Sequence, residues 1–340
     1  MDPYGLRRVV APAGVLPQRA ESLDPTLPLG EDELAIAVEA LNVDAASFRQ
    51  LEAAAGGDAG RIADELLRLV RARGKLHNPV TGSGGMLIGR VSAVGAAHPA
   101  AGALRPGDRI ATLVSLTLTP LRLDRIRAVR REIDRVECEG EAILFATGLW
   151  ARLPDDLPET LTLAALDVCG APALVARHVR PGARVLVIGA GKSGALVCAH
   201  ARELAGAGGL VVAADRSEPA LAALARAGAC DRTLVLDATD AVGALRAAGG
   251  AGGPFDVVVN CASVGGTEMA SILAVRDGGT VVFFSMATSF TAAALGAEGV
   301  GKDATLVIGN GYVPGHAALT LDLLRRHAGL RALFEERFGR

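Results

Sequence analysis

One segment near the middle of the chain constrains the fold more than any other. It reads Arg184-Val-Leu-Val-Ile-Gly189-Ala-Gly191-Lys-Ser-Gly194, an apolar run that breaks into Gly-x-Gly-x-x-Gly and leads into an Ala- and Leu-rich stretch. This order predicts a buried strand, a tight turn and a helix, the phosphate-binding unit of a dinucleotide-binding fold. The first glycine permits the turn, the second lets a pyrophosphate approach the backbone, and the third allows close helix–strand packing. The helix N-terminus adds backbone donors and a favourable dipole.

The turn and the end of the next strand supply the first predicted cofactor contacts. The apolar run 210–214 ends in Asp215, twenty-one residues after Gly194, where a carboxylate can accept the ribose 2′-OH of NAD. We therefore expect NAD as the cofactor, with NADP possible because Arg216 stands beside the acid. The predicted contacts in this part of the chain are Gly189, Gly191, Lys192, Ser193, Gly194, Asp215 and Arg216.

A phosphate-binding loop of the NTPase kind is the local alternative, because Gly191-Lys192-Ser193 matches the last three residues of that loop. Such a loop needs a glycine five positions before the Gly-Lys pair, which frees the backbone around the phosphates. Leu186 stands at that position, inside the apolar run. The sequence therefore excludes the NTPase loop.

Short apolar runs alternate with helical stretches through the second half of the chain. Six such runs are what a complete doubly wound sheet requires. They are residues 185–188, 210–214, 234–236, 256–261, 280–284 and 305–308. The sequence therefore predicts an α/β protein with a Rossmann doubly wound parallel sheet.

The first 150 residues follow a different pattern. Segments of period-two apolar alternation lie between Gly/Pro turns, which indicates a small β-rich domain with one helical insertion at 60–73. The alternating segments are 33–41, 86–94, 109–116 and 142–145. We predict a β-rich substrate domain formed by residues 1–150 together with 313–340, and a dinucleotide-binding domain formed by residues 151–312.

Open parallel sheets bind ligands beyond the carboxyl ends of their strands. Residues that follow the fourth and fifth strands of the predicted sheet should therefore line the ribose and the nicotinamide. These further predicted cofactor contacts are Cys261, Ala262, Ser263, Ser285 and Met286. A redox role for the Cys261 thiol is an alternative, although buried, inert thiols are more common.

Composition and charge narrow the class of protein. Half of the residues are hydrophobic and the formal net charge is −2, which favours a globular enzyme and argues against a nucleic-acid partner. The first residues lack the apolar core of a signal peptide and no apolar run could span a bilayer, so we expect a cytoplasmic protein with no membrane partner. The five cysteines are scattered, which argues against disulfides and a structural zinc site.

The domain order resembles that of the medium-chain dehydrogenase/reductase superfamily. Three further segments agree with it: the Pro-Gly-Asp turn in 104–111, the glycine-punctuated hairpin 85–95, and 163–170 followed by Arg180-Pro-Gly182. The resemblance implies a GroES-like N-terminal domain. Zinc members of the superfamily carry a Cys where Asp44 stands and a His-Glu pair where Gly85-Met86 stands, so Cys169 alone falls at a metal-ligand position. A catalytic zinc needs three protein ligands, so we expect a metal-free site and a buried Cys169.

Longer segments resemble a narrower family, the L-erythro-3,5-diaminohexanoate dehydrogenases of lysine fermentation. The likeness runs over nearly the whole chain and is most specific in residues 75–89, 111–122, 284–290, 294–303 and 309–312. It implies a small diamino-acid substrate, (3S,5S)-3,5-diaminohexanoate. It also implies oxidative deamination of that substrate at C3 by NAD(P)⁺, giving 5-amino-3-oxohexanoate and ammonia.

That chemistry needs groups that move protons and anchor charges. Hydride can leave C3 only when its amine is neutral, so a proton carrier is required, and His77 is the best candidate because its unperturbed pKa is about 6.5. We expect Lys75 to anchor the substrate carboxylate and Asn78, Thr81 and Ser83 to bind substrate. These residues stand in a Gly/Pro-rich loop, the kind of segment on which sites are built. The alternative is a turn whose side chains cap its own backbone.

Asp44 has two compatible interpretations. It follows the predicted strand 33–41 and precedes a helical stretch, so it can be a helix N-cap. It also stands where zinc members carry a metal ligand, so it can face the substrate ammonium. His77, Asp44 and Lys75 are thus the predicted catalytic residues.

Two other functions remain open. A zinc-free quinone or enoyl reductase of the same superfamily would reduce a C=C bond with NADPH, but Asp215 disfavours a 2′-phosphate. A non-catalytic NAD-binding protein is compatible with the fold, but has no need of the polar loop at 75–83. By analogy with the superfamily, whose members join edge strands near 306–312, we expect a homodimer or a homotetramer.

Overall fold

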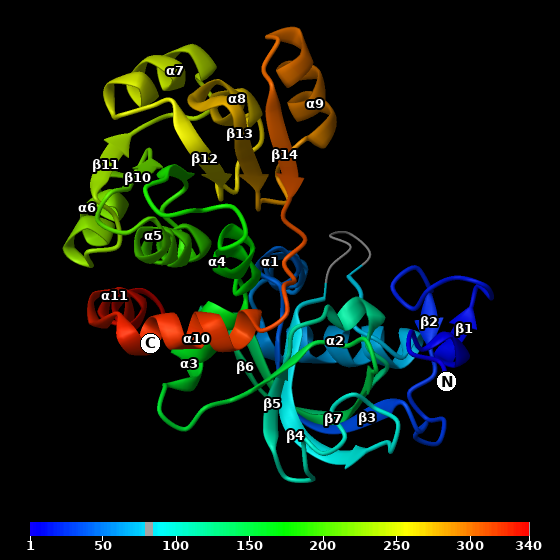
Figure 1. Ribbon diagram of the computed structural model, residues 1–340. Coiled ribbons are helices and arrows are strands. Elements are labelled where there is room, and N and C mark those ends of the chain that lie inside the picture. Colours follow the sequence, from blue (N-terminus) through cyan, green and yellow to red (C-terminus); the bar gives the residue numbers. More distant parts are fainter. Residues whose placement is uncertain (79–83, 340) are drawn as a thin grey trace. The chain divides into compact units, whose positions relative to one another are not determined.

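The protein contains two six-stranded sheets, one antiparallel and one parallel (Figure 1). Its structure is a computed structural model that describes residues 1–78 and 84–339. The chain divides into two units, Met1–Pro154 and Asp155–Arg340, and each contains one of these sheets. The α/β class and the order of a β-rich part followed by a doubly wound part are confirmed. No helix of the described residues is long and apolar enough to cross a membrane.

The first unit holds the antiparallel sheet in the order β6-β7-β3-β4-β5-β8 and a separate hairpin, β1-β2. Its strands are β1 (Val9–Ala11), β2 (Ser22–Leu23), β3 (Glu33–Asn42), β4 (Met86–Val94), β5 (Arg109–Thr112), β6 (Leu121–Arg130), β7 (Arg135–Phe145) and β8 (Trp150–Arg152). Its α-helices are α1 (Ala45–Ala54) and α2 (Ala59–Arg73), and its short 3-10 helices are η1 (Leu6–Arg8), η2 (Leu116–Leu118) and η3 (Arg131–Ile133).

Helix α2 closes the core of the first unit. Its N-cap Asp58 accepts a hydrogen bond from the Arg61 backbone, and its C-cap Gly74 has φ 60°, which ends the helix in the left-handed region. The face that the sequence predicts, with Ile62, Leu66, Leu69 and Val70, is buried against β6 and the sheet. This helix therefore fixes where the chain enters the loop that follows residue 74.

The second unit holds the parallel sheet, and α-helices alternate with its strands. The strands are β9 (Arg184–Ile188), β10 (Leu210–Asp215), β11 (Arg232–Val235), β12 (Phe255–Asn260), β13 (Val275–Phe283) and β14 (Ala304–Ile308). The helices are α3 (Glu159–Leu166), α4 (Gly170–Val175), α5 (Lys192–Ala205), α6 (Glu218–Arg226), α7 (Ala241–Gly250), α8 (Glu268–Ala274), α9 (Phe290–Gly299), α10 (His316–Arg326) and α11 (Ala328–Phe338).

The strand order of the parallel sheet is β11-β10-β9-β12-β13-β14. It is the 3-2-1-4-5-6 order of dinucleotide-binding sheets, with the reversal between β9 and β12. Helices α5 and α6 pack on β9, β10 and β11, whereas α7, α8 and α9 form the layer on the opposite face (Figure 1). The central strands are buried on both faces, which is why the sequence shows them as continuous apolar runs.

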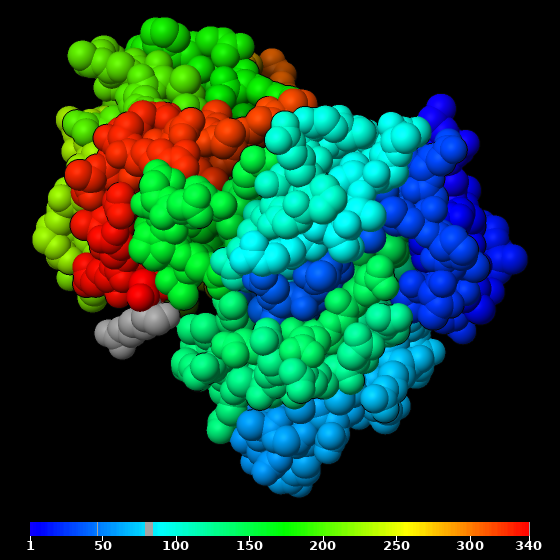
Figure 2. Space-filling view, turned by 90° about the horizontal axis from the view of Figure 1, so that it is seen from below, coloured from blue at the N-terminus to red at the C-terminus, as the bar shows by residue number. Residues whose placement is uncertain are grey.

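The last two helices belong to the second unit. Helix α10 packs against α3, α4 and α5, and α11 against α3, α5 and α6. Figure 2 shows these helices, in orange-red and red, on the surface beside green segments of the same unit. The sequence assigned residues 313–340 to the β-rich domain, so the observed division differs from the prediction. The reason is the apolar face of each helix, with Leu321, Leu324, Leu330 and Phe334 buried, which is covered by helices of the nucleotide domain.

Candidate active site

The glycine turn after β9 has the geometry that a pyrophosphate site requires. Gly189 has φ 101°, and a Cβ there would lie 2.9 Å from the backbone nitrogen of Ala262. A Cβ on Gly194 would lie 1.7 Å from the Gly189 carbonyl oxygen, so only glycine lets α5 pack this close to β9. A Cβ on Gly191 would meet no atom of the described residues within 4 Å. The first and third glycines are therefore required by packing, and the second faces open space.

The carboxylate of Asp215 is fixed at the end of β10. Its Oδ2 accepts a hydrogen bond from the Ala190 backbone at 2.7 Å, and its Oδ1 accepts one from the Ser217 backbone at 2.8 Å. The side chain thus joins the glycine turn to the start of α6. Arg216 is exposed and lies 3.9 Å from Asp237, a loose surface pair. The carboxylate of Asp215, held by the Ala190 and Ser217 amides, therefore lies at the glycine turn, where the sequence predicts a group that binds the ribose.

The carboxyl ends of β12 and β13 carry the second group of predicted contacts. Asn260 is fully buried, its amide donates to Thr267 Oγ1 at 2.9 Å and Ser271 Oγ at 3.0 Å, and its Oδ1 accepts from the Ala262 backbone at 3.1 Å. This network sets the path of the chain through Ala262 and Ser263. The side chain of Ser263 is exposed. Ser285 is buried and accepts from the Ala287 backbone.

Two side chains at these strand ends have contrasting surroundings. The predicted burial of Cys261 is confirmed: it lies beside Ser193, and burial raises the pKa of its thiol to about 12, which favours the structural interpretation over a redox one. Met286 is 83% exposed. An exposed methionine at the end of a central strand offers a flexible apolar surface to a ligand.

Two basic residues, Lys192 and Arg337, lie near the glycine turn and make separate contacts. Lys192 Nζ donates to Asp167 Oδ2 at 2.5 Å and lies 5.8 Å from the centre of the Phe338 ring. The guanidinium of Arg337, from α11, donates to the carbonyl oxygen of Ala190 at 2.9 Å. The sequence singled out Lys192 but not Arg337, because nothing in the pattern of α11 shows that its last turn reaches a turn formed 147 residues earlier.

The loop that follows α2 carries the predicted substrate residues of the first unit. Lys75 is 0% exposed and its ammonium donates to the carbonyl oxygen of Pro17 at 2.9 Å. His77 is partly buried, and its Nδ1 atom has no hydrogen-bond partner among the described residues. Asn78 is buried, and its amide donates to Gln50 Oε1 at 2.9 Å. Thr81 and Ser83 lie outside the described residues.

Helix α1 brings Asp44 to the same neighbourhood. Asp44 precedes the helix, its carboxylate accepts a hydrogen bond from the Ser47 backbone at 3.4 Å, and the side chain is exposed. The N-cap interpretation is thus confirmed, and the exposed carboxylate leaves the second interpretation open. Asn78 also donates to the Ser47 carbonyl, and a Cβ on Gly85 would lie 2.8 Å from the Asp44 backbone nitrogen. Both ends of the loop therefore lie against the start of α1.

The electrostatics of this loop favour neutral bases. Burial lowers the pKa of Lys75 to about 8, and the charge of Arg73 adds to the effect. Burial also lowers the pKa of His77 below its usual value of 6.5, with further contributions from Lys75 and Arg73. At neutral pH the imidazole of His77 is therefore uncharged and can accept a proton.

Metal ligands do not gather at this site in the part of the chain that the structure describes. No group of three His, Cys, Asp or Glu residues there could hold an ion. Cys169 is buried, its carbonyl oxygen accepts a hydrogen bond from Thr320, and burial raises the pKa of its thiol to about 12. The sequence-based interpretation of Cys169 as a small buried side chain is confirmed.

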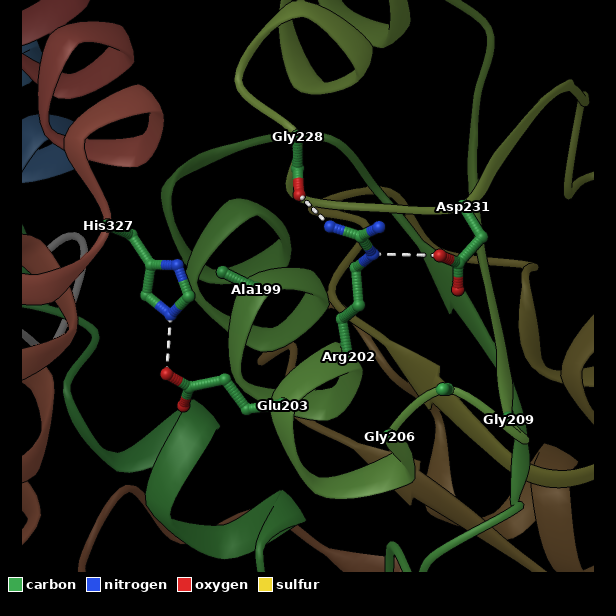
Figure 3. A pocket seen from close by; sticks show the side chains of 9 residues that line it. Ala199, Arg202, Glu203, Gly206, Gly209, Gly228, Asp231 and His327 are labelled. Carbon is green, nitrogen blue, oxygen red and sulfur yellow. Dashed lines mark hydrogen bonds and ion pairs between the residues drawn. The ribbon is translucent and has the colours of Figure 1, made fainter.

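A pocket of about 480 Å³ lies at the other end of α5, away from the glycine turn. Arg202, Glu203 and His327 line it, together with Asp231, which precedes β11 (Figure 3). Arg202 is paired with Asp231 at 2.7 Å, and His327 with Glu203 at 2.5 Å. Because these side chains pair with one another and lie at the amino ends of the strands, the pocket is not the candidate cofactor site.

Comparison with solved structures supports the fold. A mycobacterial quinone oxidoreductase is 22% identical with a TM-score of 0.55, over 95% of this chain and 92% of that one. A mycobacterial protein complexed with NADPH is 20% identical with a TM-score of 0.52, over 93% and 87% of the two chains. The fold is thus that of the medium-chain dehydrogenases/reductases.

Comparison with known sequences identifies a narrower family. A model described as the L-erythro-3,5-diaminohexanoate dehydrogenase N-terminal domain matches residues 7–154. A protein of Acetoanaerobium sticklandii named L-erythro-3,5-diaminohexanoate dehydrogenase is 50% identical over 98% of each chain. A protein of Fusobacterium nucleatum subsp. nucleatum with the same name is 49% identical over 98% of this chain and 97% of its own. The chain therefore belongs to the L-erythro-3,5-diaminohexanoate dehydrogenase family.

Proposed function

We propose that the protein catalyses the oxidative deamination of (3S,5S)-3,5-diaminohexanoate at C3, giving 5-amino-3-oxohexanoate and ammonia. The observation that carries this proposal is the identity of about one residue in two with relatives named for that substrate, over nearly the full length of both chains. The proposal includes the metabolic setting that the resemblance implies, which is lysine fermentation in the cytoplasm.

The proposed cofactor is NAD⁺, with NADP⁺ as a weaker alternative. A nicotinamide cofactor is supported by the fit of the glycine turn to a pyrophosphate and by the similarity to a protein complexed with NADPH. When bound, the nicotinamide accepts the hydride from C3 of the substrate. NAD⁺ is favoured because the carboxylate of Asp215, held by the Ala190 and Ser217 amides, would repel a ribose 2′-phosphate.

The cofactor contacts divide between two groups of strand ends. Gly189, Gly191, Gly194 and the backbone at Lys192 and Ser193 would hold the pyrophosphate, with Asp215 and Arg216 at the adenine ribose. Residues at the carboxyl ends of β12 and β13 would line the nicotinamide ribose and ring: Cys261, Ala262, Ser263, Ser285 and Met286. Cys261 takes part through its backbone, since its thiol is buried.

His77 is the proposed proton carrier. The substrate ammonium must lose a proton before hydride transfer, and the imine that follows must gain water and release ammonia. The Nδ1 atom of His77 is buried and has no hydrogen-bond partner among the described residues, and together with the lowered pKa this supports a neutral imidazole that accepts the first proton. The same group can return the proton to the departing amine.

The substrate charges need partners as well. We propose that the exposed carboxylate of Asp44 holds a substrate ammonium, and that Asn78, Thr81 and Ser83 bind the rest of the molecule. For Lys75, full burial against Pro17 supports an electrostatic role over direct contact with the substrate carboxylate. After burial, the charge of Lys75 is the next cause that lowers the pKa of His77, and both favour a neutral imidazole.

One assay separates the candidate functions. NADH absorbance at saturating NAD⁺ is followed with 3,5-diaminohexanoate, and NADPH consumption is followed in parallel with a quinone. NADH formation with release of one ammonia per turnover supports the deamination, whereas NADPH oxidation by the quinone alone would establish a reductase. If neither reaction occurs and NAD⁺ still binds, the protein would be a non-catalytic binding protein.

Treatment with a chelator tests the proposed metal-free chemistry. A rate that is lost on chelation and restored by Zn²⁺ would contradict a metal-free mechanism.

A further inference from the structure

The last turn of α11 contacts the glycine turn through a forked side chain. Arg337 donates from Nη1 to the Ala190 carbonyl oxygen at 2.9 Å and from Nη2 to the Ala220 carbonyl oxygen at 3.3 Å. Ala190 is the middle residue of the Gly-Ala-Gly turn, and Ala220 lies in the first turn of α6. One guanidinium therefore bridges the two backbone segments that follow β9 and β10.

The contact fixes the peptide unit that leads into α5. In a planar trans peptide, the carbonyl of Ala190 and the N–H of Gly191 point in opposite directions. A donor held on that carbonyl therefore also fixes the direction of the Gly191 N–H. The preceding peptide unit is held by Asp215, which accepts from the Ala190 N–H at 2.7 Å. Both peptide units before the helix N-terminus are thus held by charged side chains, one from β10 and one from α11.

Helix α11 is itself held along α5 at both ends. Near its start, Glu203 of α5 accepts from Arg326 at 2.6 and 2.9 Å and from His327 at 2.5 Å. At its end, the Phe338 ring lies 5.8 Å from the Lys192 ammonium at the start of α5. The two helices are therefore antiparallel over about 16 Å, the length of eleven helical residues. The position of Arg337 is set by these contacts and not by the turn alone.

We propose that Arg337 is a positioning residue for the dinucleotide, which acts by holding the Ala190 peptide and so orienting the N-terminal donors of α5. The inference rests on the proposed dinucleotide function of this turn. The N-cap of α5 is Gly191, which has no side chain that could cap the helix and orient its N-terminal donors. An arginine is suited to the role because its rigid fork reaches two carbonyls at once, which a lysine ammonium does not reproduce.

The test is calorimetric titration of the full chain with NAD⁺ and with ADP-ribose. In Arg337→Ala, both dissociation constants should rise by about tenfold or more, because a charge-assisted hydrogen bond that orders the turn is lost. The kcat at saturating NAD⁺ and the KM for 3,5-diaminohexanoate should stay within about twofold of the wild type. Arg337→Lys should give an intermediate dissociation constant.

A matched control lies on the same helix. Arg331→Ala removes a partly exposed arginine that pairs with Glu335, and it should leave both dissociation constants unchanged. A purely structural role for Arg337 would lower the melting temperature of Arg337→Ala and leave its NAD⁺ affinity intact, which would overturn the inference. If Arg337→Ala does not fold, wild-type affinity in Arg337→Lys and Arg337→Gln would overturn it equally. A wild type that binds neither NAD⁺ nor NADP⁺ would overturn the proposed function, and this inference with it.

Discussion

Asp215 accepts hydrogen bonds from the Ala190 and Ser217 backbone amides, and no basic side chain of the described residues forms an ion pair with it at the place where the ribose is expected. We predict that Asp215→Ser raises the ratio of kcat/KM for NADP⁺ to that for NAD⁺ by roughly tenfold or more, because the carboxylate repels a 2′-phosphate and a hydroxyl does not. Steady-state kinetics with both cofactors measures the ratio. An unchanged ratio would place Asp215 away from the ribose.

The lowered pKa values of His77 and Lys75 predict different pH profiles. If His77 accepts the proton, kcat should fall as the pH drops through a pKa below 6.5, because the imidazole becomes charged, and should be level above it. If Lys75 is the base, the fall should begin below about pH 8, because its amine is protonated there. A profile of kcat from pH 5 to 9 separates the two, and His77→Ala should lower kcat roughly 10²–10⁴-fold.

Asp44→Asn is the companion variant for that experiment. If Asp44 binds the substrate ammonium, its replacement should raise the KM for 3,5-diaminohexanoate. If Asp44 is the base, the same replacement should lower kcat. Full turnover in His77→Ala together with an inactive Asp44→Asn would identify Asp44 as the base and reject the assignment proposed above.

At single residues, the sequence predicted what depends on local geometry. The roles of Gly189 and Gly194 follow from a motif whose parts lie within six residues, and the structure confirms both. The roles of Lys192 and Arg337 depend on partners from distant elements, so no local pattern contains them. Lys75 was predicted to anchor substrate, but its full burial is a property of the packed loop that the residue type does not reveal.

At the scale of elements, the contact between β9 and α5 depends on Gly194. We predict that Gly194→Ala lowers both the melting temperature and the NAD⁺ affinity, because the new methyl would stand 1.7 Å from the Gly189 carbonyl and α5 would have to move away. Overpacking of this kind costs about 1–3 kcal/mol of unfolding free energy.

The control for that variant is Gly249→Ala in α7. A Cβ there meets no described atom within 4 Å, so the substitution should stabilise the helix slightly, by up to about 1 kcal/mol, and leave NAD⁺ binding intact. Thermal unfolding and calorimetry apply to both. Equal NAD⁺ affinity in Gly194→Ala and the wild type would show that the turn tolerates a displaced helix.

The sequence predicts the strands whose buried residues form an apolar pattern, but not the strands whose residues are mainly charged. The sequence predicted only 142–145 of β7, and none of β6 (Leu121–Arg130). Arginines recur along β6 and glutamates along β7, and cross-strand ion pairs such as Arg125–Glu139 at 2.7 Å and Arg130–Glu137 at 3.3 Å face solvent. A sheet face built from paired charges lacks the apolar alternation on which strand prediction depends.

At the scale of the whole molecule, the placement of α10 and α11 could not be read from the sequence. Their amphipathic pattern predicts that each helix buries one face, but the pattern is silent about which surface covers it. In the structure, their position depends on side chains from other elements. Glu203 on α5 pairs with Arg326, and Asp156 before α3 pairs with Arg325.

The assembly state is a prediction at the same scale. The strand β14 lies at the edge of the parallel sheet and leaves Ile308 59% exposed, which favours pairing with a second copy in a homodimer or a homotetramer. Light scattering after size exclusion should give a mass of two or four chains for the wild type, and Ile308→Lys should lower it. A monomeric wild type, or a variant of unchanged mass, would reject this edge as the interface.

The distance along the chain between Ala190 and Arg337 has a consequence for synthesis. Arg337 is added 147 residues after Ala190, which takes roughly 7–30 s at a translation rate of about 5–20 residues per second. During that interval the nascent nucleotide domain already has the means to form its first strands and the Asp215 contact, yet the arginine that completes the turn does not exist. A ribosome-bound chain should therefore make β9, β10 and the carboxylate of Asp215 well before it acquires the arginine that completes the cofactor turn.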